Sequence, residues 1–569
     1  METILLADND LDFLNMRAES LERAGYRVIK ACSLEEVRQQ LSDARVHLAI
    51  LDVRMENDDD ERDVSGLVLA QDPDYRPIPK IILTNFPTTQ AARMALKLQP
   101  DGMPPAVDFF DKKETPEALI QAIEQAFAQH VRINWDLYIR WGRQDELSSP
   151  FLTKLLVDRS AELEDVLRKL FYDYQQLTLG RILTRRPGWA LLTAFAYKAH
   201  GHKEEQFVLS CGQRDAVRAD RAGYGSLPQA TRRALMLAES VETMHWGAIA
   251  YRLVGCGDIE EITTLTRFYH QQSAERVAAS IADLFQTTLR PWYARGREKQ
   301  DRPLEALCRE RLEADGRMLT QAELERRIIS LSQAAPAAGV LKELSWSPRK
   351  LEFRPIERAE FSCPNPIPYL LGRRLAIQSS TQCGNIHGRL DGASILVDRS
   401  GQTWAVDFGR SGSGPLVQDF VSLEASVRFD MLGEPEIALR YELERRLFAQ
   451  RRLGDPVDAE GVSAEIEKAL RVICEIRAHA AEIVSPEVEP YLIGLLFCTL
   501  GRFLDYQPEL KYTRGELTNY LHALLLLGMS CQRLAALEDR LHQLPAQAAQ
   551  SLWLDETNQE AWVEGRCVV

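Results

Sequence analysis

Short apolar runs recur through the first 130 residues, and polar residues follow most of them directly. The clearest run is 48–55, LAILDVRM, in which the apolar stretch ends at Asp52. The other four runs are 4–7, 28–31, 78–83 and 106–110. Segments with helical periodicity separate the runs, and buried parallel strands read as continuous apolar stretches. The pattern predicts an α/β fold with a doubly wound, parallel, five-stranded sheet.

Ligands of such sheets bind at the edge where the carboxyl ends of the strands meet. The polar residues expected at that edge are Asp8, Asn9, Asp10, Asp52, Thr84, Asn85, Asp111 and Lys112. Carboxylate oxygens suit Mg²⁺, which also binds phosphate oxygens, while a lysine and a hydroxyl neutralise and hydrogen-bond a phosphoryl group. The chemistry predicted is phosphorylation of Asp52 itself.

Residues 1–129 resemble the receiver domain of two-component response regulators. The resemblance implies that Asp52 accepts the phosphoryl group, that Thr84 is the switch hydroxyl and that Lys112 pairs with the phosphate. It implies a Mg²⁺ site made of Asp8, Asn9, Asp52 and the backbone carbonyl of Arg54, with Phe109 or Phe110 as the aromatic that moves with the switch. The implied partner is a histidine kinase or a phosphotransfer protein.

Three features depart from that family. Asn9 stands where a second acid is usual, which predicts weaker Mg²⁺ binding unless Asp10 helps. Lys113 replaces the usual proline after the lysine, so the bond before it is expected to be trans. The insertion 56–63, ENDDDERD, lengthens the loop after Asp52 and adds negative charge.

The rest of the chain predicts a sheet followed by helices. A helical connector is expected over 130–180, and strands over 188–197, 206–211, 233–244 and 246–254 with a helix at 214–222. Residues 259–535 are expected to be mostly helical. Residues 536–569 form a tail without an assigned role.

The second informative stretch is 384–414, GNIHGRLDGASILVDRSGQTWAVDFGRSGSG. Two short apolar strands, 394–398 and 403–407, flank turn residues and predict a hairpin. A hairpin would bring 387–391 beside 407–410. A second site is therefore predicted there.

That stretch resembles the catalytic core of the protein-kinase-like and aminoglycoside-phosphotransferase-like fold. The resemblance implies a bilobal α+β fold with a small lobe at 181–258 and a large, mostly helical lobe at 259–535. It makes Asp407 the metal-binding acid, with His387 and Arg389 beside it in the nucleotide site. Asp419 would hold the catalytic-type loop in place.

The departures from this second family bear on activity. Arg389 stands at the position of the catalytic base, Ser394 at that of the metal-binding asparagine, and Ser210 or Cys211 at that of the phosphate-pairing lysine. A guanidinium cannot take a proton from an attacking hydroxyl. The prediction is a catalytically inactive, pseudokinase-like module, with ATP binding through Asp407 left open.

Three functions remain from the sequence. The first is a response regulator whose inactive kinase-like output module binds an unidentified protein target. The second is an active phosphotransferase, regulated by the receiver, in which Asp391 replaces the base. The third is a receiver that serves only as a phosphate sink on a scaffold.

Composition narrows the setting. The formal net charge of −14 and a sequence pI of about 5.4 argue against nucleic acid as a partner. Ten cysteines without a CxxC pair fit a reduced cytoplasm. The apolar segments 491–504 and 521–529 are shorter than a membrane span requires, so no membrane association is expected.

Overall fold

The computed structural model describes residues 2–57, 59–100, 102–141, 161–198, 204–294, 296–317, 319–372 and 381–543. The chain divides into two compact units. Unit 1 contains Met1–Arg221 and Leu235–Glu260, and unit 2 contains Ala222–Ala234 and Glu261–Val569.

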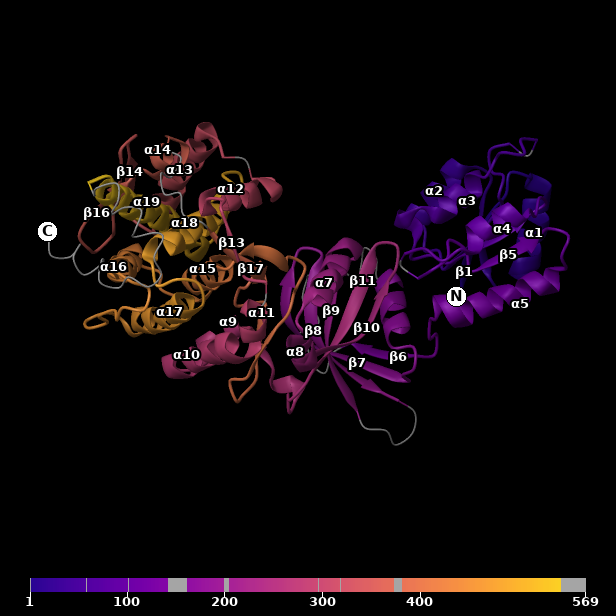
Figure 1. Cartoon of the computed structure of the whole chain (residues 1–569), viewed down its shortest axis with the longest axis horizontal. Coiled ribbons are helices and arrows are strands. Elements are labelled where there is room, and N and C mark those ends of the chain that lie inside the picture. The colour runs from indigo at the N-terminus through magenta and orange to yellow at the C-terminus, as the bar shows by residue number, and fades with distance from the viewer. Residues whose placement is uncertain are drawn as a thin grey trace. The chain divides into compact units, whose positions relative to one another are not determined.

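Unit 1 begins with a five-stranded parallel sheet in the order β2-β1-β3-β4-β5. Figure 1 shows this part of the chain in indigo to purple. Its strands are β1 (Thr3–Ala7), β2 (Arg27–Ala31), β3 (Leu48–Leu51), β4 (Lys80–Thr84) and β5 (Asp108–Asp111). Its helices are α1 (Leu11–Arg23), α2 (Leu34–Asp43), α3 (Ser65–Gln71), α4 (Thr89–Leu96) and α5 (Pro116–Ala126). This is the flavodoxin-like doubly wound order, and the predicted parallel sheet is confirmed.

Alternate side chains of these strands enter two separate cores. Ile4, Leu6 and Ile50 pack with residues of α1 and α5 on one face. Leu5 and Leu51 pack with residues of α2, α3 and α4 on the other. Burial of both faces explains why the strands read as unbroken apolar runs.

The second part of unit 1 is a six-stranded sheet in the order β10-β11-β9-β8-β7-β6. Its strands are β6 (Tyr138–Trp141), β7 (Gln176–Arg186), β8 (Trp189–Tyr197), β9 (Glu205–Gln213), β10 (Leu235–Glu242) and β11 (Trp246–Leu253). All neighbours are antiparallel except β6 and β7. The four predicted strands and the helix α7 (Arg214–Ser226) are confirmed.

The connector over 130–180, expected to be helical, is helical only in part. Residues 161–170 are helical, but β6 and the start of β7 lie in the same range. The register of β7 against β8 shifts between Leu179 and Ile182 and again before Thr184. These irregularities break the period-two pattern by which a strand is recognised.

Unit 2 contains three small sheets. They are formed by β12 (Thr263–Thr264), β18 (Ile395–Val397) and β19 (Thr403–Ala405); by β13 (Glu298–Gln300), β17 (Thr381–Ile386) and β20 (Gly412–Pro415); and by β14 (Glu343–Trp346), β15 (Lys350–Arg354) and β16 (Phe361–Pro364). Ile395 pairs with Ala405, so the predicted hairpin is confirmed. The other two sheets lie in regions expected to be loop or helix.

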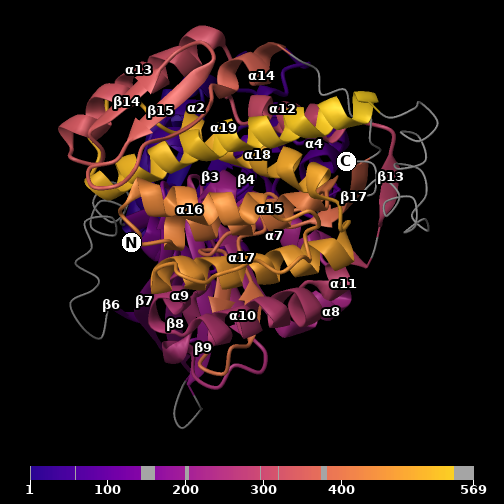
Figure 2. The same cartoon turned by 90° about the vertical axis from the view of Figure 1, so that its left-hand side faces the viewer.

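The remaining elements of the described part of unit 2 are mostly helices, as predicted. Its helices are α8 (Gln229–Ala234), α9 (Leu265–Gln271), α10 (Ala274–Asp283), α11 (Arg290–Tyr293), α12 (Leu304–Ala314), α13 (Gln321–Ala337), α14 (Pro366–Gly372), α15 (Val417–Ser426), α16 (Ile437–Phe448), α17 (Ala464–Ile483), α18 (Val488–Leu504) and α19 (Arg514–Gln543). Figure 2 shows α15 to α19 as neighbouring layers. By length and composition, the stretch 514–538 of α19 is apolar enough to cross a membrane, but 61% of it is buried inside the fold.

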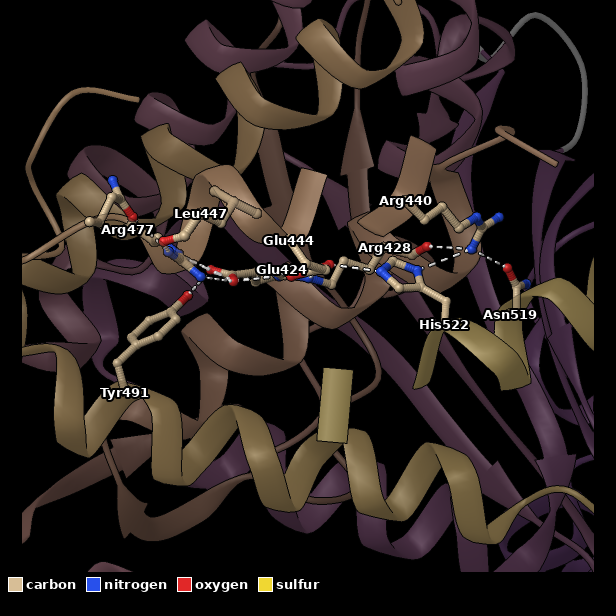
Figure 3. A network of polar contacts seen from close by, with 10 residues as sticks. Glu424, Arg428, Arg440, Glu444, Leu447, Arg477, Tyr491, Asn519 and His522 are labelled. Atoms are coloured by element: carbon tan, nitrogen blue, oxygen red, sulfur yellow. Dashed lines mark hydrogen bonds and ion pairs between the residues drawn. The ribbon is translucent and has the colours of Figure 1, made fainter. Parts of the chain in front are cut away.

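A buried network of charged and polar side chains joins these helices (Figure 3). Arg428 donates to Glu424 and, over 2.8 and 3.1 Å, to Glu444. Glu424 also accepts from Arg477, over 2.8 and 3.0 Å, and from the hydroxyl of Tyr491. The imidazole of His522 completes the network from α19, 2.7 Å from Glu444 and 3.2 Å from a guanidinium nitrogen of Arg440. Each carboxylate is thus paired, as burial of a charge demands.

Candidate functional site

The carboxyl edge of the parallel sheet carries a buried cluster of two acids and one lysine. Lys112 follows β5, and its ammonium lies 2.6 Å from an oxygen of Asp52 and 2.6 Å from an oxygen of Asp8. Asp8 follows β1 and Asp52 follows β3, which are adjacent strands. One cation therefore bridges two carboxylates at the edge where ligands of such sheets bind.

Neighbouring groups fix the orientation of Asp52. Its Oδ1 accepts from the backbone N–H of Val53 over 2.6 Å, and the hydroxyl of Thr84 also hydrogen-bonds to it. The start of α3 approaches closely, because a Cβ on Gly66 would lie 1.8 Å from the carbonyl oxygen of Asp52. Glycine at position 66 is therefore needed for this packing.

Burial sets the acidity of the cluster. It raises the pKa of Asp8 to about 6, although Lys112 partly opposes the shift. It also raises the pKa of Asp52, against the opposing influence of Lys112 and Thr84. Burial alone would lower the pKa of Lys112, but Asp52 and Asp8 together raise it. One lysine only partly compensates two buried acids.

The oxygens present fit a Mg²⁺ ion. The buried Oδ1 of Asn9 has no hydrogen-bond partner in the described part of the chain. Together with Asp8 and Asp52 it gives two carboxylates and an amide oxygen, the hard oxygen ligands that Mg²⁺ prefers. Among the described residues no group of three His, Cys, Asp or Glu side chains could hold a metal, so a site here depends on amide and backbone oxygens.

The side chain of Asp10, the alternative acid for the Mg²⁺ site, is engaged at the start of α1. Its exposed carboxylate caps α1, accepting from the backbone N–H groups of Asp12 and Phe13 over 3.0 and 3.1 Å. Arg54 is buried, and its guanidinium stacks 3.6 Å from the ring centre of Phe86. Its backbone carbonyl remains the predicted metal ligand.

Two of the departures from the receiver family, and the two phenylalanines expected near the switch, can be located in the structure. The described residues contain no cis peptide bond, so the predicted trans bond before Lys113 is confirmed. Within the inserted loop, Asp63 accepts from the backbone N–H groups of Glu56 and Asn57 over 2.9 and 2.8 Å. Phe109 packs with the core that contains α4, whereas Phe110 packs on the opposite face.

The second predicted site, in unit 2, is organised around Asp419. Its carboxylate accepts from the backbone N–H groups of His387 and Gly388, each over 2.8 Å, and from the hydroxyl of Tyr293 over 3.0 Å. The imidazole of His387 is fully buried, with Nε2 2.9 Å from the carbonyl oxygen of Val406. The His387 side chain therefore contacts its own loop, and its contact with a nucleotide stays a prediction.

Ser394 is also occupied by its own loop. Its hydroxyl accepts from the backbone N–H of Asp391 over 2.9 Å and lies 3.0 Å from the carbonyl oxygen of Arg389. Asp391 in turn accepts from the N–H of Ser394 over 2.9 Å. These bonds close the loop from 389 to 394 and leave Ser394 in a supporting role.

Asp407 has an unusual backbone. Its φ is +68°, and it is one of two described non-glycine residues with a left-handed conformation. Such strain costs about 1–3 kcal/mol and clusters at functional sites. The position next to the loop 387–394 is therefore compatible with a ligand-binding role for Asp407.

In unit 1, Ser210 and Cys211 of β9 were the candidates for the missing lysine. The hydroxyl of Ser210 donates to Asp220 of α7 over 2.9 Å and accepts from the indole N–H of Trp189 over 2.8 Å. Burial raises the pKa of Cys211 to about 12, which makes its thiol inert. A serine hydrogen-bonded to an aspartate thus stands where a lysine paired with an acid was expected between the strand and the helix.

The comparisons with known proteins cover two separate parts of the chain. Residues 315–497, about a third of the chain, match the family model "Ternary complex associated domain 9". No curated protein matches the chain. The network of Figure 3 lies largely in the matched residues.

Several solved structures are similar to the N-terminal part. A CheY-like receiver domain protein from Methanospirillum hungatei JF-1 is 21% identical, over 23% of this chain and 95% of that one, with a TM-score of 0.19. A putative response regulator from Chloroflexus aurantiacus J-10-fl is 25% identical, over 22% and 98%, with a TM-score of 0.19. A Burkholderia pseudomallei response regulator, solved with a phosphorylated aspartic acid and a calcium ion, is 20% identical, over 29% and 89%, with a TM-score of 0.18.

The class of the N-terminal domain follows from its own geometry. The strand order is that of CheY. The carboxyl edge carries the cluster of Asp8, Asp52, Thr84 and Lys112. Fold and site together are those of a receiver-type domain, and the function of the remainder is a separate question.

Proposed function

We propose that this protein is a response regulator whose Asp52 accepts a phosphoryl group from a histidine kinase or phosphotransfer protein. The observation that carries the proposal is the ammonium of Lys112, 2.6 Å from both Asp52 and Asp8 at the ligand-binding edge of the sheet. A structural ion pair needs one acid for one lysine, whereas Lys112 is shared by two buried acids. The excess negative charge of the second acid supports a site that also binds a metal cation.

The chemistry is one phosphoryl transfer. An oxygen of Asp52 forms a bond to phosphorus as the nitrogen–phosphorus bond of the donor phosphohistidine breaks, and the imidazole leaves with the electron pair. Lys112 then pairs with a phosphoryl oxygen, and the hydroxyl of Thr84 donates to another. A bound Mg²⁺, held by Asp8, Asn9, Asp52 and the carbonyl of Arg54, would neutralise charge on the phosphoryl oxygens.

The test uses a small phosphoryl donor. Incubation of the full chain with acetyl phosphate and Mg²⁺ should add one phosphoryl group, found by mass spectrometry on the peptide that contains Asp52. Asp52→Asn should remain unmodified, and Asp63→Asn, which alters a nearby acid of the inserted loop, should be modified like the parent. Equal modification of the parent and of Asp52→Asn would contradict the assignment.

For residues 181–535 we propose a kinase-like module that is catalytically inactive and binds a protein target. The contacts of Asp419, the strained Asp407 and the hairpin of β18 and β19 support this reading. The pairing of Ser210 with Asp220, in place of a lysine and an acid, supports inactivity. The proposed boundaries are 1–129, 130–180, 181–258, 259–535 and 536–569.

The alternative is an active, receiver-regulated phosphotransferase in which Asp391 acts as the base. The bonds between Asp391 and the backbone of its own loop favour the inactive reading. ATP turnover that Asp407→Ala abolishes would establish the alternative. Thermal stabilisation by ATP and Mg²⁺ without turnover would support a bound but unreactive nucleotide.

The setting that fits these proposals is the cytoplasm. The nine described cysteines form no disulfide, which agrees with a reducing compartment. A receiver that only stores phosphate on a scaffold remains the third possibility. A partner whose binding changes on phosphorylation of Asp52 would exclude it.

A further inference from the structure

Unit 1 contains a large cavity away from the Asp52 cluster. Its volume is about 820 Å³, which is in the range of small-molecule sites. The cavity walls come from the segments 76–80, 103–107, 130–132 and 169–174 and from the six-stranded sheet with α7. Lys80 is the first residue of β4, whereas Thr84, its last, reaches Asp52. The cavity therefore lies at the opposite edge of the same parallel strands.

The cavity lining is strongly basic. Eight lysines and arginines line it against three carboxylates, although the chain as a whole carries a net charge of −14. Concentration of one sign of charge in a cleft with protein walls focuses the field on a ligand of the opposite sign. The charge balance points to an anionic occupant.

Some of these cations are already compensated. Arg218 pairs with Glu242 over 2.7 Å, and Arg252 and Lys198 both pair with Glu205. These pairs show that the cavity wall satisfies a cation where an acid is within reach. The charges of these cations are already neutralised by acids, so these side chains are less available to bind a ligand.

Other lining cations form no ion pair with an acid among the described residues. Lys169 and Arg221 have no ion pair or side-chain hydrogen bond there, although the charges of Asp165 and Glu162 partly oppose the lowering of the Lys169 pKa by burial. Arg132 stacks 4.9 Å from the ring centre of Tyr172 and is the other non-glycine residue with a left-handed backbone. Lys80 is buried, and its ammonium donates to the carbonyl oxygen of Tyr75. The four cations come from four separate segments.

The surroundings of Lys80 and Arg76 favour a bound anion in the cavity. Burial and, second to it, the charge of Arg76 lower the pKa of Lys80 to about 7, and the charge of Asp72 partly opposes this shift. Arg76 itself is oriented by the carbonyl oxygen of Pro104, over 2.9 Å. A bound anion would relieve this repulsion between like charges.

We propose that this cavity binds a small molecule with more than one phosphate group. Arginine and lysine are the usual partners of phosphate oxygens, and cations from separate segments can hold separate phosphates. Tyr172, already in contact with Arg132, offers a ring beside them on which a nucleoside base could stack. Because β4 and β5 connect this edge to Thr84 and Lys112, a ligand here would bind the receiver domain at the ends of the strands that carry its switch residues.

The experiment is a calorimetric titration of the full chain with inorganic phosphate, pyrophosphate and ATP, in EDTA so that no divalent cation is present. Pyrophosphate and ATP should bind at micromolar concentration and phosphate more weakly. Lys169→Gln and Arg221→Gln should each weaken binding about tenfold, the worth of a charge-assisted hydrogen bond. Arg27→Gln removes a cation of the same kind from an exposed position on β2 and should leave the affinity unchanged.

The outcomes separate the alternatives. Absence of binding by all three probes, or equal affinities of the parent, Lys169→Gln and Arg221→Gln, would overturn the proposal. If Lys112→Met lost binding while Lys169→Gln and Arg221→Gln kept it, the phosphates would bind at the Asp52 cluster. This result would also overturn the proposal. Binding of a glutamate-rich peptide but of none of the phosphates would replace a small-molecule site with a protein-docking site. Equal affinities for pyrophosphate and ATP would show that the nucleoside part contributes nothing, whereas tighter ATP binding would identify a nucleotide site.

Discussion

Two regions of this molecule place a buried cation between two buried carboxylates, and they differ in how completely the charges are satisfied. At the sheet edge, Lys112 alone serves Asp8 and Asp52, and burial raises the pKa of Asp8 to about 6. In the helical network, Arg428 serves Glu424 and Glu444 with further donors, and the pKa of Glu444 falls to about 2.

The difference distinguishes a reactive cluster from a structural one. Arg428 is a planar fork whose two ends each engage a carboxylate, with Arg477 and His522 completing the shell. Lys112 is a point charge on a flexible stem and can follow a charge that moves. The cluster that remains short of positive charge is the one able to take up a cation.

The largest effect is expected from breaking the helical network. Arg428→Met should lower the free energy of unfolding by about 3–5 kcal/mol, because two buried carboxylates lose their shared partner. Denaturant unfolding followed by circular dichroism measures it. Arg445→Met removes an exposed guanidinium paired with Glu442 and should cost at most about 0.5 kcal/mol. A similar small loss for Arg428→Met would mean that the network contributes little.

The two regions should also respond to pH in opposite directions. Burial lowers the pKa of His522 to about 4, so the unfolded chain binds more protons between about pH 6.5 and 4. The unfolding free energy of the network should fall by up to about 3 kcal/mol as pH falls through that range. His522→Gln should remove this dependence, and an unchanged slope would contradict it.

At the sheet edge, the unfolding free energy is expected to change with pH in the opposite direction. Because the pKa of Asp8 is raised to about 6, the folded chain binds more protons than the unfolded chain between about pH 4 and 6. Its contribution to stability is present at low pH and is lost, by up to about 3 kcal/mol, as pH rises through that range. Thermal unfolding of Asp8→Asn should lack this loss.

A smaller effect is expected from removal of the lysine. Lys112→Met should bind Mg²⁺ about tenfold more tightly than the parent, because a competing cation leaves the two carboxylates. The same variant should be phosphorylated poorly, since the phosphoryl group loses its partner. Lys113→Met, at the exposed next position, is the matched control. Weaker Mg²⁺ binding by Lys112→Met than by the parent would show that the Lys112 ammonium does not compete with Mg²⁺ for the two carboxylates.

The smallest effect concerns Asn9. Asn9→Asp should tighten Mg²⁺ binding a few-fold, because charge count is one of the terms that set cation affinity. Asp10→Asn should leave Mg²⁺ binding unchanged and destabilise the protein by about 1 kcal/mol or less, since Asp10 caps α1. Both are read by calorimetric titration and thermal unfolding. If Asp10→Asn weakened Mg²⁺ binding instead, Asp10 would be the second acid.

The receiver-type sheet could be predicted because its signals are local. Each apolar run is a strand, and the residue after it marks the edge, so Asp8, Asp52, Thr84 and Lys112 were predicted together and do lie together. Gly66, which the packing against Asp52 requires, has no such signal, because only the tertiary contact makes it necessary.

The helical network could not be predicted, because its signals are not local in the sequence. Charged residues on a helix usually face solvent, so Glu424, Arg428 and Glu444 resemble surface positions. A signal was present for Arg428, which lies in the largely apolar stretch 425–432, ASVRFDML, whereas Glu444 is followed directly by Arg445 and Arg446. Their partners lie on other helices, and the pairing depends on packing that a single sequence does not reveal.

The most direct test of the contrast is the binding of Mg²⁺ at the Asp52 cluster. Calorimetric titration should find one Mg²⁺ per chain for the parent, lost in Asp8→Asn and in Asp52→Asn. Binding should persist in Asp60→Asn, which removes a carboxylate from the neighbouring inserted loop. Mg²⁺ binding that survives the loss of both Asp8 and Asp52, or no saturable binding by the parent, would contradict the account.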